Sequence, residues 1–132
     1  MMYLDANFFV FALLDTTEKG EAARKLRVDI IRGKKAAITS VLALDEVMWY
    51  LLKGKKSELI RMAIEHIYAT PNLAVKEVPA LAALTAVDIL EQYELKPRDA
   101  FHAATMKAFG VNTIVTDDAD FDRIPWIKRV GI

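Results

Sequence analysis

The sequence predicts an α/β protein in which helices cover both faces of a parallel sheet. Short apolar runs typical of strands occur at residues 2–4, 36–39, 73–78 and 113–116, and longer helical patterns separate them along the chain. Because parallel strands are joined by crossovers that usually contain a helix, this alternation favours a parallel sheet. Right-handed crossovers then bring the functional loops to the carboxyl ends of the strands.

The first two helices are expected on different grounds. Residues 6–14 are apolar on most sides, whereas residues 18–32 carry an apolar stripe opposite a charged one. Gly33 suits the end of the second helix, because glycine is favoured just beyond a helix C-terminus. The strand at residues 36–39 follows.

Two more helices are expected before the third strand. Ser40 is a favoured N-cap for a helix over residues 41–53, which Gly54 ends. Ser57 similarly precedes a helix that reaches residue 68.

The second half of the chain continues the alternation. A strand at residues 73–78 precedes a helix over residues 79–93 with proline in its first turn, and another helix covers residues 97–109. The clearest strand, residues 113–116, is followed by an acidic loop and a last short strand at residues 127–130. No linker or internal repeat interrupts this order, so residues 1–132 are expected to form a single domain.

Composition narrows the function classes. Eighteen basic and eighteen acidic side chains cancel, so only local patches could attract nucleic acid. No apolar run approaches the roughly 20 residues of a membrane helix, and the absence of cysteine excludes thiol catalysis and disulfides. With no leader pattern at the start, the cytoplasm is the expected compartment. The high apolar content, 54%, favours a surface that a partner chain covers.

Four acidic residues stand out at the ends of strands or in helices: Asp5, Glu46, Asp99 and Asp118. Carboxylates gathered in one cleft repel each other unless a cation neutralises them, and oxygen ligands suit Mg²⁺ or Mn²⁺. Each residue also has a simpler interpretation, as a helix cap, a helix-start acid or a solvated turn. Their joint placement favours a metal site.

Neighbouring polar residues are less informative by sequence alone. Either Asp45 or Glu46 is expected to face solvent, and the buried one needs a partner. His102, one turn after Asp99, could orient a carboxylate or position substrate, although a hydrogen-bonded structural histidine is the preferred interpretation. His66 carries no functional signal.

Four segments together resemble the PIN-domain family over nearly the whole chain. They are Tyr3-Leu4-Asp5-Ala6-Asn7, Thr39 to Val47 with Asp45-Glu46, Pro97-Arg98-Asp99-Ala100-Phe101-His102, and Ile114 to Asp122. The resemblance implies a three-layer α/β/α sandwich with a central, mostly parallel sheet. It places Asp5, Glu46, Asp99 and Asp118 at the family's acidic positions, Asp120 at an additional one, and Asn7 and Thr116 at supporting polar positions. Within the doublet Asp117-Asp118, the Thr-x-Asp-x-Asp-Phe frame favours Asp118.

The resemblance also implies a function. A single-domain example is similar to the toxin of a VapBC-type toxin–antitoxin pair, a Mg²⁺- or Mn²⁺-dependent ribonuclease that cleaves single-stranded RNA. We therefore expect an RNA substrate, an antitoxin partner, a homodimer and no membrane association. Arg98 is the favoured RNA contact, and lysines at 34, 35, 53, 55 and 56 are alternatives that also suit helix ends.

Two other functions remain open at this point. A catalytically silent RNA-binding or scaffold domain would keep the fold without turnover. An aspartate-based phosphoryl acceptor would also place an acid after the first strand, but no Lys-Pro follows Val115 and Asp5-Ala6-Asn7 lacks a second aspartate.

Overall fold

The computed structural model describes residues 1–132 and contains one sheet of five parallel strands in the order β3-β2-β1-β4-β5. The strands are β1 (Met2–Leu4), β2 (Ala37–Ser40), β3 (Leu73–Lys76), β4 (Thr113–Val115) and β5 (Lys128–Val130). Because Tyr3 of β1 pairs with both Ile38 and Ile114, β1 is the central strand. The residue that follows it, Asp5, therefore lies at the middle of the sheet's carboxyl edge.

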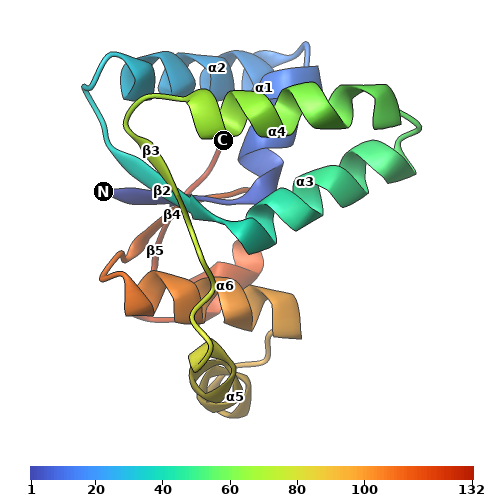
Figure 1. Ribbon diagram of the computed structural model, residues 1–132. Coiled ribbons are helices and arrows are strands. Elements are labelled where there is room, and N and C mark those ends of the chain that lie inside the picture. The colour runs from blue at the N-terminus through green and yellow to red at the C-terminus, as the bar shows by residue number, and fades with distance from the viewer.

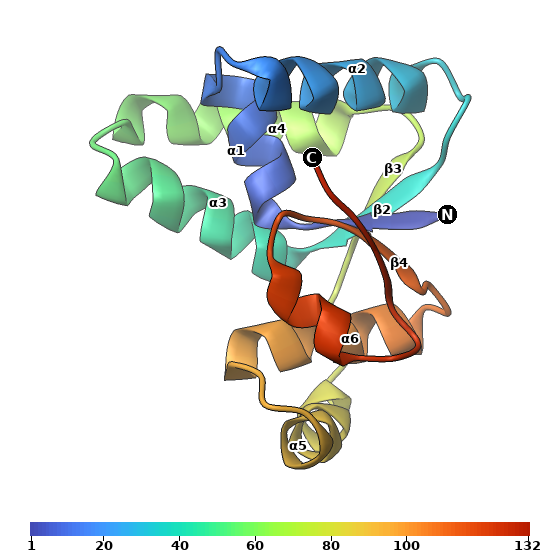
Figure 2. The ribbon, with the colours of Figure 1, turned by 180° about the vertical axis from the view of Figure 1, so that it is seen from behind.

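Six helices complete the three layers that the resemblance implied. They are α1 (Ala6–Leu14), α2 (Glu18–Ile31), α3 (Val41–Lys53), α4 (Ile60–Ala69), α5 (Ala82–Gln92) and α6 (Pro97–Ala108). Helices α1 to α4 lie on one side of the sheet and α5 and α6 on the other (Figure 1). The opposite view shows the short 3₁₀ helix Ala119–Arg123 on the same side as α6 (Figure 2).

Side chains alternate between the two sides of β1. Tyr3 joins a core formed with α5, α6 and the 3₁₀ helix, whereas Leu4 joins a core with Phe8 of α1 and Ile30 of α2. This is the period-two alternation of a strand that is buried on both faces. Helix α6 contributes Ala100 and two further buried alanines to the core that contains Tyr3.

Helix α3 buries its apolar side chains against other helices. Its buried residues Val47 and Leu51 pack with Ala6 of α1 and Ala63 of α4. This packing of α3 leaves Asp45 exposed and Glu46 only partly exposed. The prediction that one of these two acids faces solvent is confirmed. Glu46 lies on α3 and reaches the carboxyl edge of the sheet from that helix.

Some element boundaries differ from the sequence prediction. Helix α5 begins at Ala82 rather than at Pro79, so the proline precedes the helix instead of occupying its first turn. The helix expected from Ser57 begins as a 3₁₀ turn, and α4 proper starts at Ile60. By contrast, Pro97 is the first residue of α6, as predicted. None of the six helices is both long and apolar enough to cross a membrane.

Candidate metal centre

Asp5 is fixed at the junction between β1 and α1. It is the N-cap of α1, and its Oδ1 accepts a 2.7 Å hydrogen bond from the backbone N–H of Ala6. Its Oδ2 accepts a second bond, of 2.8 Å, from the hydroxyl of Thr116. The buried carboxylate of Asp5 can therefore be both the N-cap of α1 and a member of the candidate metal site.

The hydroxyl of Thr116 joins three segments at the sheet edge. It donates to Asp5 and accepts bonds from the Asn7 side-chain amide (2.9 Å) and the backbone N–H of Asp118 (3.1 Å). A hydroxyl has one hydrogen and two lone pairs, so all of its capacity is used. Asn7 and Thr116, the supporting residues that the resemblance implies, are therefore hydrogen-bonded to each other, and Thr116 also to Asp5.

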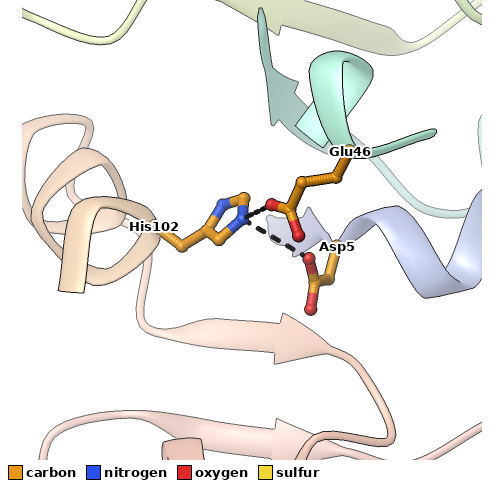
Figure 3. Close-up of side chains that lie close together, drawn as sticks. All are labelled: Asp5, Glu46 and His102. Carbon is orange, nitrogen blue, oxygen red and sulfur yellow. Dashed lines mark hydrogen bonds and ion pairs between the residues drawn. The ribbon is translucent and has the colours of Figure 1, made fainter. Parts of the chain in front are cut away.

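Glu46 reaches the same edge from α3 and meets His102 of α6. The Nε2 of His102 is hydrogen-bonded to Oε1 of Glu46 and lies 3.6 Å from Oδ1 of Asp5 (Figure 3). Burial lowers the pKa of His102, but the bond to Glu46 and the charge of Asp5 outweigh it, so the pKa is raised above its usual value. His102 is hydrogen-bonded, as sequence reasoning preferred, and its partner is a carboxylate of the cluster.

A second group of carboxylates comes from α6 and the loop after β4. Asp99, Asp118 and Asp120 each offer an oxygen within 4.8 Å of the others. Burial, followed by the charge of Asp118, raises the pKa of Asp99 to about 7, with Asp5 and Asp120 contributing in the same direction. In addition, the buried Oδ2 of Asp99 has no hydrogen-bond partner.

These features fit a divalent cation. A buried carboxylate oxygen without a partner is costly, and the raised pKa of Asp99 results first from burial and then from the negative charge of Asp118. A cation would satisfy both, and an oxygen-rich donor set suits Mg²⁺ or Mn²⁺. Asp5, Glu46, Asp99, Asp118 and Asp120 are the residues that could hold it.

The PIN-domain family model matches residues 2–127, which is nearly the whole chain. The chain belongs to the PIN-domain family. The predicted fold class is confirmed with it, since the five-stranded parallel sheet between two helical layers is the PIN-like architecture.

Two curated relatives match this PIN domain over their full length. They are VapC ribonuclease Mb1869c of Mycobacterium bovis and ribonuclease VapC13 of Mycobacterium tuberculosis. Each is 25% identical over 132 residues, covering 99% of this chain and 100% of the relative.

Solved structures share the fold at lower identity. Mycobacterium tuberculosis VapC20, described as a sarcin-ricin loop cleaving toxin, superposes with a TM-score of 0.75 at 19% identity, covering 92% of this chain and 93% of that one. VapBC2 of Rickettsia felis, bound to a promoter DNA fragment, gives 0.73 at 20% identity, with coverage of 99% and 98%. A DNA-bound VapBC of Salmonella typhimurium also gives 0.73 at 20% identity, with coverage of 98% and 96%.

The two acids of the Asp117-Asp118 doublet have separate surroundings in this PIN domain. Asp117 forms an ion pair with Lys19 of α2, and its Oδ1 accepts a 2.8 Å bond from the backbone N–H of Ile132. Although burial opposes it, the Lys19 contact leads to a lowered pKa for Asp117. Asp118 instead accepts a 2.9 Å hydrogen bond from the backbone N–H of Asp120 and lies close to the carboxylates of Asp99 and Asp120.

The basic residues differ in their distance from the PIN-domain carboxylates. Arg98 is exposed and directly precedes Asp99. Lys34 and Lys35 precede β2 and so lie at the amino edge of the sheet, opposite the site. Lys53 is the last residue of α3, about 10 Å along the helix axis from Glu46, and Lys55 and Lys56 follow it.

Sequence reasoning missed Tyr3 and Ser40. Ser40 precedes α3, but its hydroxyl makes no cap; it bonds to the Tyr3 hydroxyl at 2.7 Å. The Tyr3 hydroxyl also lies 2.6 Å from Nδ1 of His102, and burial raises the pKa of Tyr3. The only available signal was the position of a tyrosine two residues before Asp5, in a strand buried on both faces.

Proposed function

We propose that this chain, as a single PIN-like nuclease domain over residues 1–132, is a metal-dependent endoribonuclease that cleaves single-stranded or looped RNA. We further propose that it is the toxin of a VapBC-type toxin–antitoxin module. The observation that carries the proposal is a pair of neighbouring acidic groups, Asp5 with Glu46 and Asp99 with Asp118 and Asp120, in which a buried oxygen of Asp99 has no partner. Full-length relatives named as VapC ribonucleases support it.

The cation and the carboxylates have different roles in the proposed reaction. A divalent cation supplies Lewis acidity for phosphodiester hydrolysis when it is bound. Asp5 is held in one orientation by Thr116 and Ala6, and Asp99 presents a free buried oxygen. Without a cation these carboxylates repel a phosphate backbone, so the same charges exclude substrate from the metal-free protein.

Two exposed residues beside the carboxylates are suited to contact RNA. Arg98 can neutralise a phosphate next to Asp99. Tyr50 is half-exposed and one helical turn from Glu46; burial raises its pKa, and the charges of Glu46, Asp5 and Asp118 raise it further. An aromatic ring at that place can stack on an unpaired base, which is how proteins commonly recognise single-stranded RNA.

The proposed partners are an antitoxin and a second copy of the chain. The antitoxin is proposed because structural neighbours of this fold were solved as VapBC complexes. For the homodimer, the support is exposed apolar side chains on two helices. Trp49 and Leu52 of α3 are each 55% exposed, and Leu84 of α5 is 66% exposed.

The decisive experiment is cleavage of mixed single-stranded RNA by the wild-type protein, in Mg²⁺, Mn²⁺ or EDTA. Asp5→Asn is compared with Asp45→Asn, which alters an exposed acid on α3 beside Glu46. We expect metal-dependent cleavage by the wild type and by Asp45→Asn, and none by Asp5→Asn, with all three equally folded by circular dichroism.

Other outcomes would redirect the assignment. Cleavage that persists in EDTA, or an active Asp5→Asn protein, would contradict the carboxylate–metal mechanism. An absence of cleavage in every metal, with RNA binding retained, would favour a silent RNA-binding or scaffold domain. Formation of an acyl phosphate at Asp5 that hydroxylamine cleaves would favour a phosphoryl acceptor.

A further inference from the structure

A chain of three buried polar side chains leads from β2 to the carboxylates. The hydroxyl of Tyr3 lies between Oγ of Ser40, at 2.7 Å, and Nδ1 of His102, at 2.6 Å. On its other side, Nε2 of His102 bonds to Glu46. We call Ser40, Tyr3 and His102 the buried relay; each is at most 1% exposed.

The donor and acceptor in each hydrogen bond of the relay can be assigned by starting at the Glu46 carboxylate. A carboxylate only accepts hydrogen bonds, so Nε2 of His102 donates to Glu46. In a neutral ring Nδ1 then accepts from the Tyr3 hydroxyl, which in turn accepts from Ser40. In a charged ring the Tyr3 hydroxyl accepts from Nδ1 and donates to Ser40. Each polar atom of the relay has at least one hydrogen-bond partner in both cases.

This assignment separates His102 from the cation ligands. Asp5, Glu46 and His102 do offer ligand atoms within 4.8 Å of one another. However, both ring nitrogens of His102 are engaged, one by Tyr3 and the other by Glu46. A nitrogen that donates its hydrogen has no lone pair left for a metal.

The side chain at the end of the relay is the one most in need of orientation. Glu46 lies on α3, which packs on other helices rather than on the sheet, and glutamate has several rotatable bonds. Figure 3 shows its carboxylate turned toward that of Asp5, with His102 contacting both. Asp5 itself is already fixed by Thr116 and Ala6.

We propose that the buried relay positions the carboxylate of Glu46 beside Asp5, so that the two can bind the same cation. His102 is thus a positioning residue that acts through Glu46. Tyr3, supported by Ser40, fixes the orientation of the His102 ring. This inference rests on the proposed function, because it requires the carboxylates to bind a metal. Preordering Glu46 removes the entropic cost of ordering it when the cation arrives.

The test measures Mn²⁺ binding to the full chain without RNA, by electron paramagnetic resonance titration. Loss of a residue that orients a metal ligand typically weakens metal affinity about 10- to 100-fold, and we expect this for His102→Leu. His102→Gln should recover most of the affinity, because its amide N–H can replace Nε2–H. Tyr3→Phe, which deletes only a hydroxyl, should cause a smaller loss, and the Asp45→Asn control none.

A double-mutant cycle distinguishes positioning from direct ligation. If His102 acts through Glu46, then His102→Leu should weaken Mn²⁺ binding in the wild type but cause little further loss in a Glu46→Gln background. Equal losses in both backgrounds would make His102 a ligand in its own right and overturn the inference.

The remaining outcomes separate this inference from the proposed function. If Tyr3→Phe and His102→Leu bind Mn²⁺ as the wild type does and only their melting temperatures fall, the relay is structural and the inference is wrong. If the wild type binds no Mn²⁺, the proposed metal site fails and the inference falls with it. Should His102→Leu not fold, Tyr3→Phe and His102→Gln decide the question.

Discussion

The hydroxyl of Thr116 donates a 2.8 Å hydrogen bond to Oδ2 of Asp5, across 111 positions of sequence. This bond joins the carboxyl ends of β1 and β4, the two neighbouring strands at the centre of the candidate site. Because the same hydroxyl also accepts from the Asn7 side chain and the backbone N–H of Asp118, Thr116 contacts two polar side chains and one backbone group of the site.

Thr116→Val tests this junction, because valine has nearly the same shape but no hydroxyl. We expect cleavage to fall at least about tenfold, since Asp5 loses the bond that orients it. Unfolding in urea should show a loss of about 1–3 kcal/mol from the groups left without partners. Thr105→Val is the matched control, because the buried hydroxyl of Thr105 bonds only to Phe101 in its own helix. Equal activity in the two variants would refute the role of Thr116.

The pKa of Asp99, raised to about 7, predicts a pH-dependent stability of the metal-free protein. Between about pH 4 and pH 7 the folded state keeps a proton on Asp99 that the unfolded chain has lost, so this group's contribution to stability falls as pH rises. Melting temperatures in EDTA should reveal the decline, and Asp99→Asn should reduce it.

Metal binding should oppose that decline. A cation displaces the proton from Asp99, so the rise in melting temperature caused by Mg²⁺ should be larger at pH 8 than at pH 5. A Mg²⁺ effect of the same size at both pH values would contradict the placement of Asp99 at the cation.

The doublet Asp117-Asp118 provides a paired test. Asp117→Asn removes the charge that pairs with Lys19, so we expect a small loss of stability and nearly unchanged cleavage. Asp118→Asn should have the opposite pattern, with cleavage greatly reduced and stability retained or increased, because it relieves repulsion with Asp99. RNA cleavage and thermal melting of the two variants measure both effects, and a reversal would exchange their assignments.

Tyr50 is predicted to bind RNA through its ring. In an Asp5→Asn background, which prevents cleavage, Tyr50→Ala should weaken binding of single-stranded RNA about tenfold, whereas Tyr50→Phe should bind normally. Tyr68→Ala is a control, because Tyr68 is a comparably exposed tyrosine on α4. Fluorescence anisotropy with a labelled oligonucleotide measures all four proteins, and equal affinities would exclude stacking on Tyr50.

The exposed apolar side chains of α5 predict a change in oligomeric state. Leu84→Glu places a charge where the proposed dimer would bury a leucine, and should convert a dimer to a monomer in sedimentation equilibrium. Glu91→Gln, an exposed change on the same helix, should leave the mass unchanged. A wild-type monomer would contradict the homodimer directly.

Much of the architecture could be predicted because its signals are local. Pro97 marks the first residue of α6, and Gly33 follows α2 with a φ of 77°, a conformation that glycine adopts without strain. The start of α5 and the hydrogen bond of Ser40 were predicted wrongly, because each local signal is compatible with two arrangements. Pro79 is acceptable both within a first helical turn and before a helix, and Ser40 can cap a helix or bond elsewhere.

The candidate acids were also predictable, since parallel strands end at one edge and residues such as Asp5 and Asp118 follow strands. Which partner each side chain has was not predictable. His102 meets Glu46 across 56 positions and Tyr3 across 99, while Asp117 turns to Lys19 and its neighbour Asp118 does not. Periodicity reports which face of an element a residue occupies, whereas these pairings depend on how α3 and α6 pack and which rotamers that packing allows.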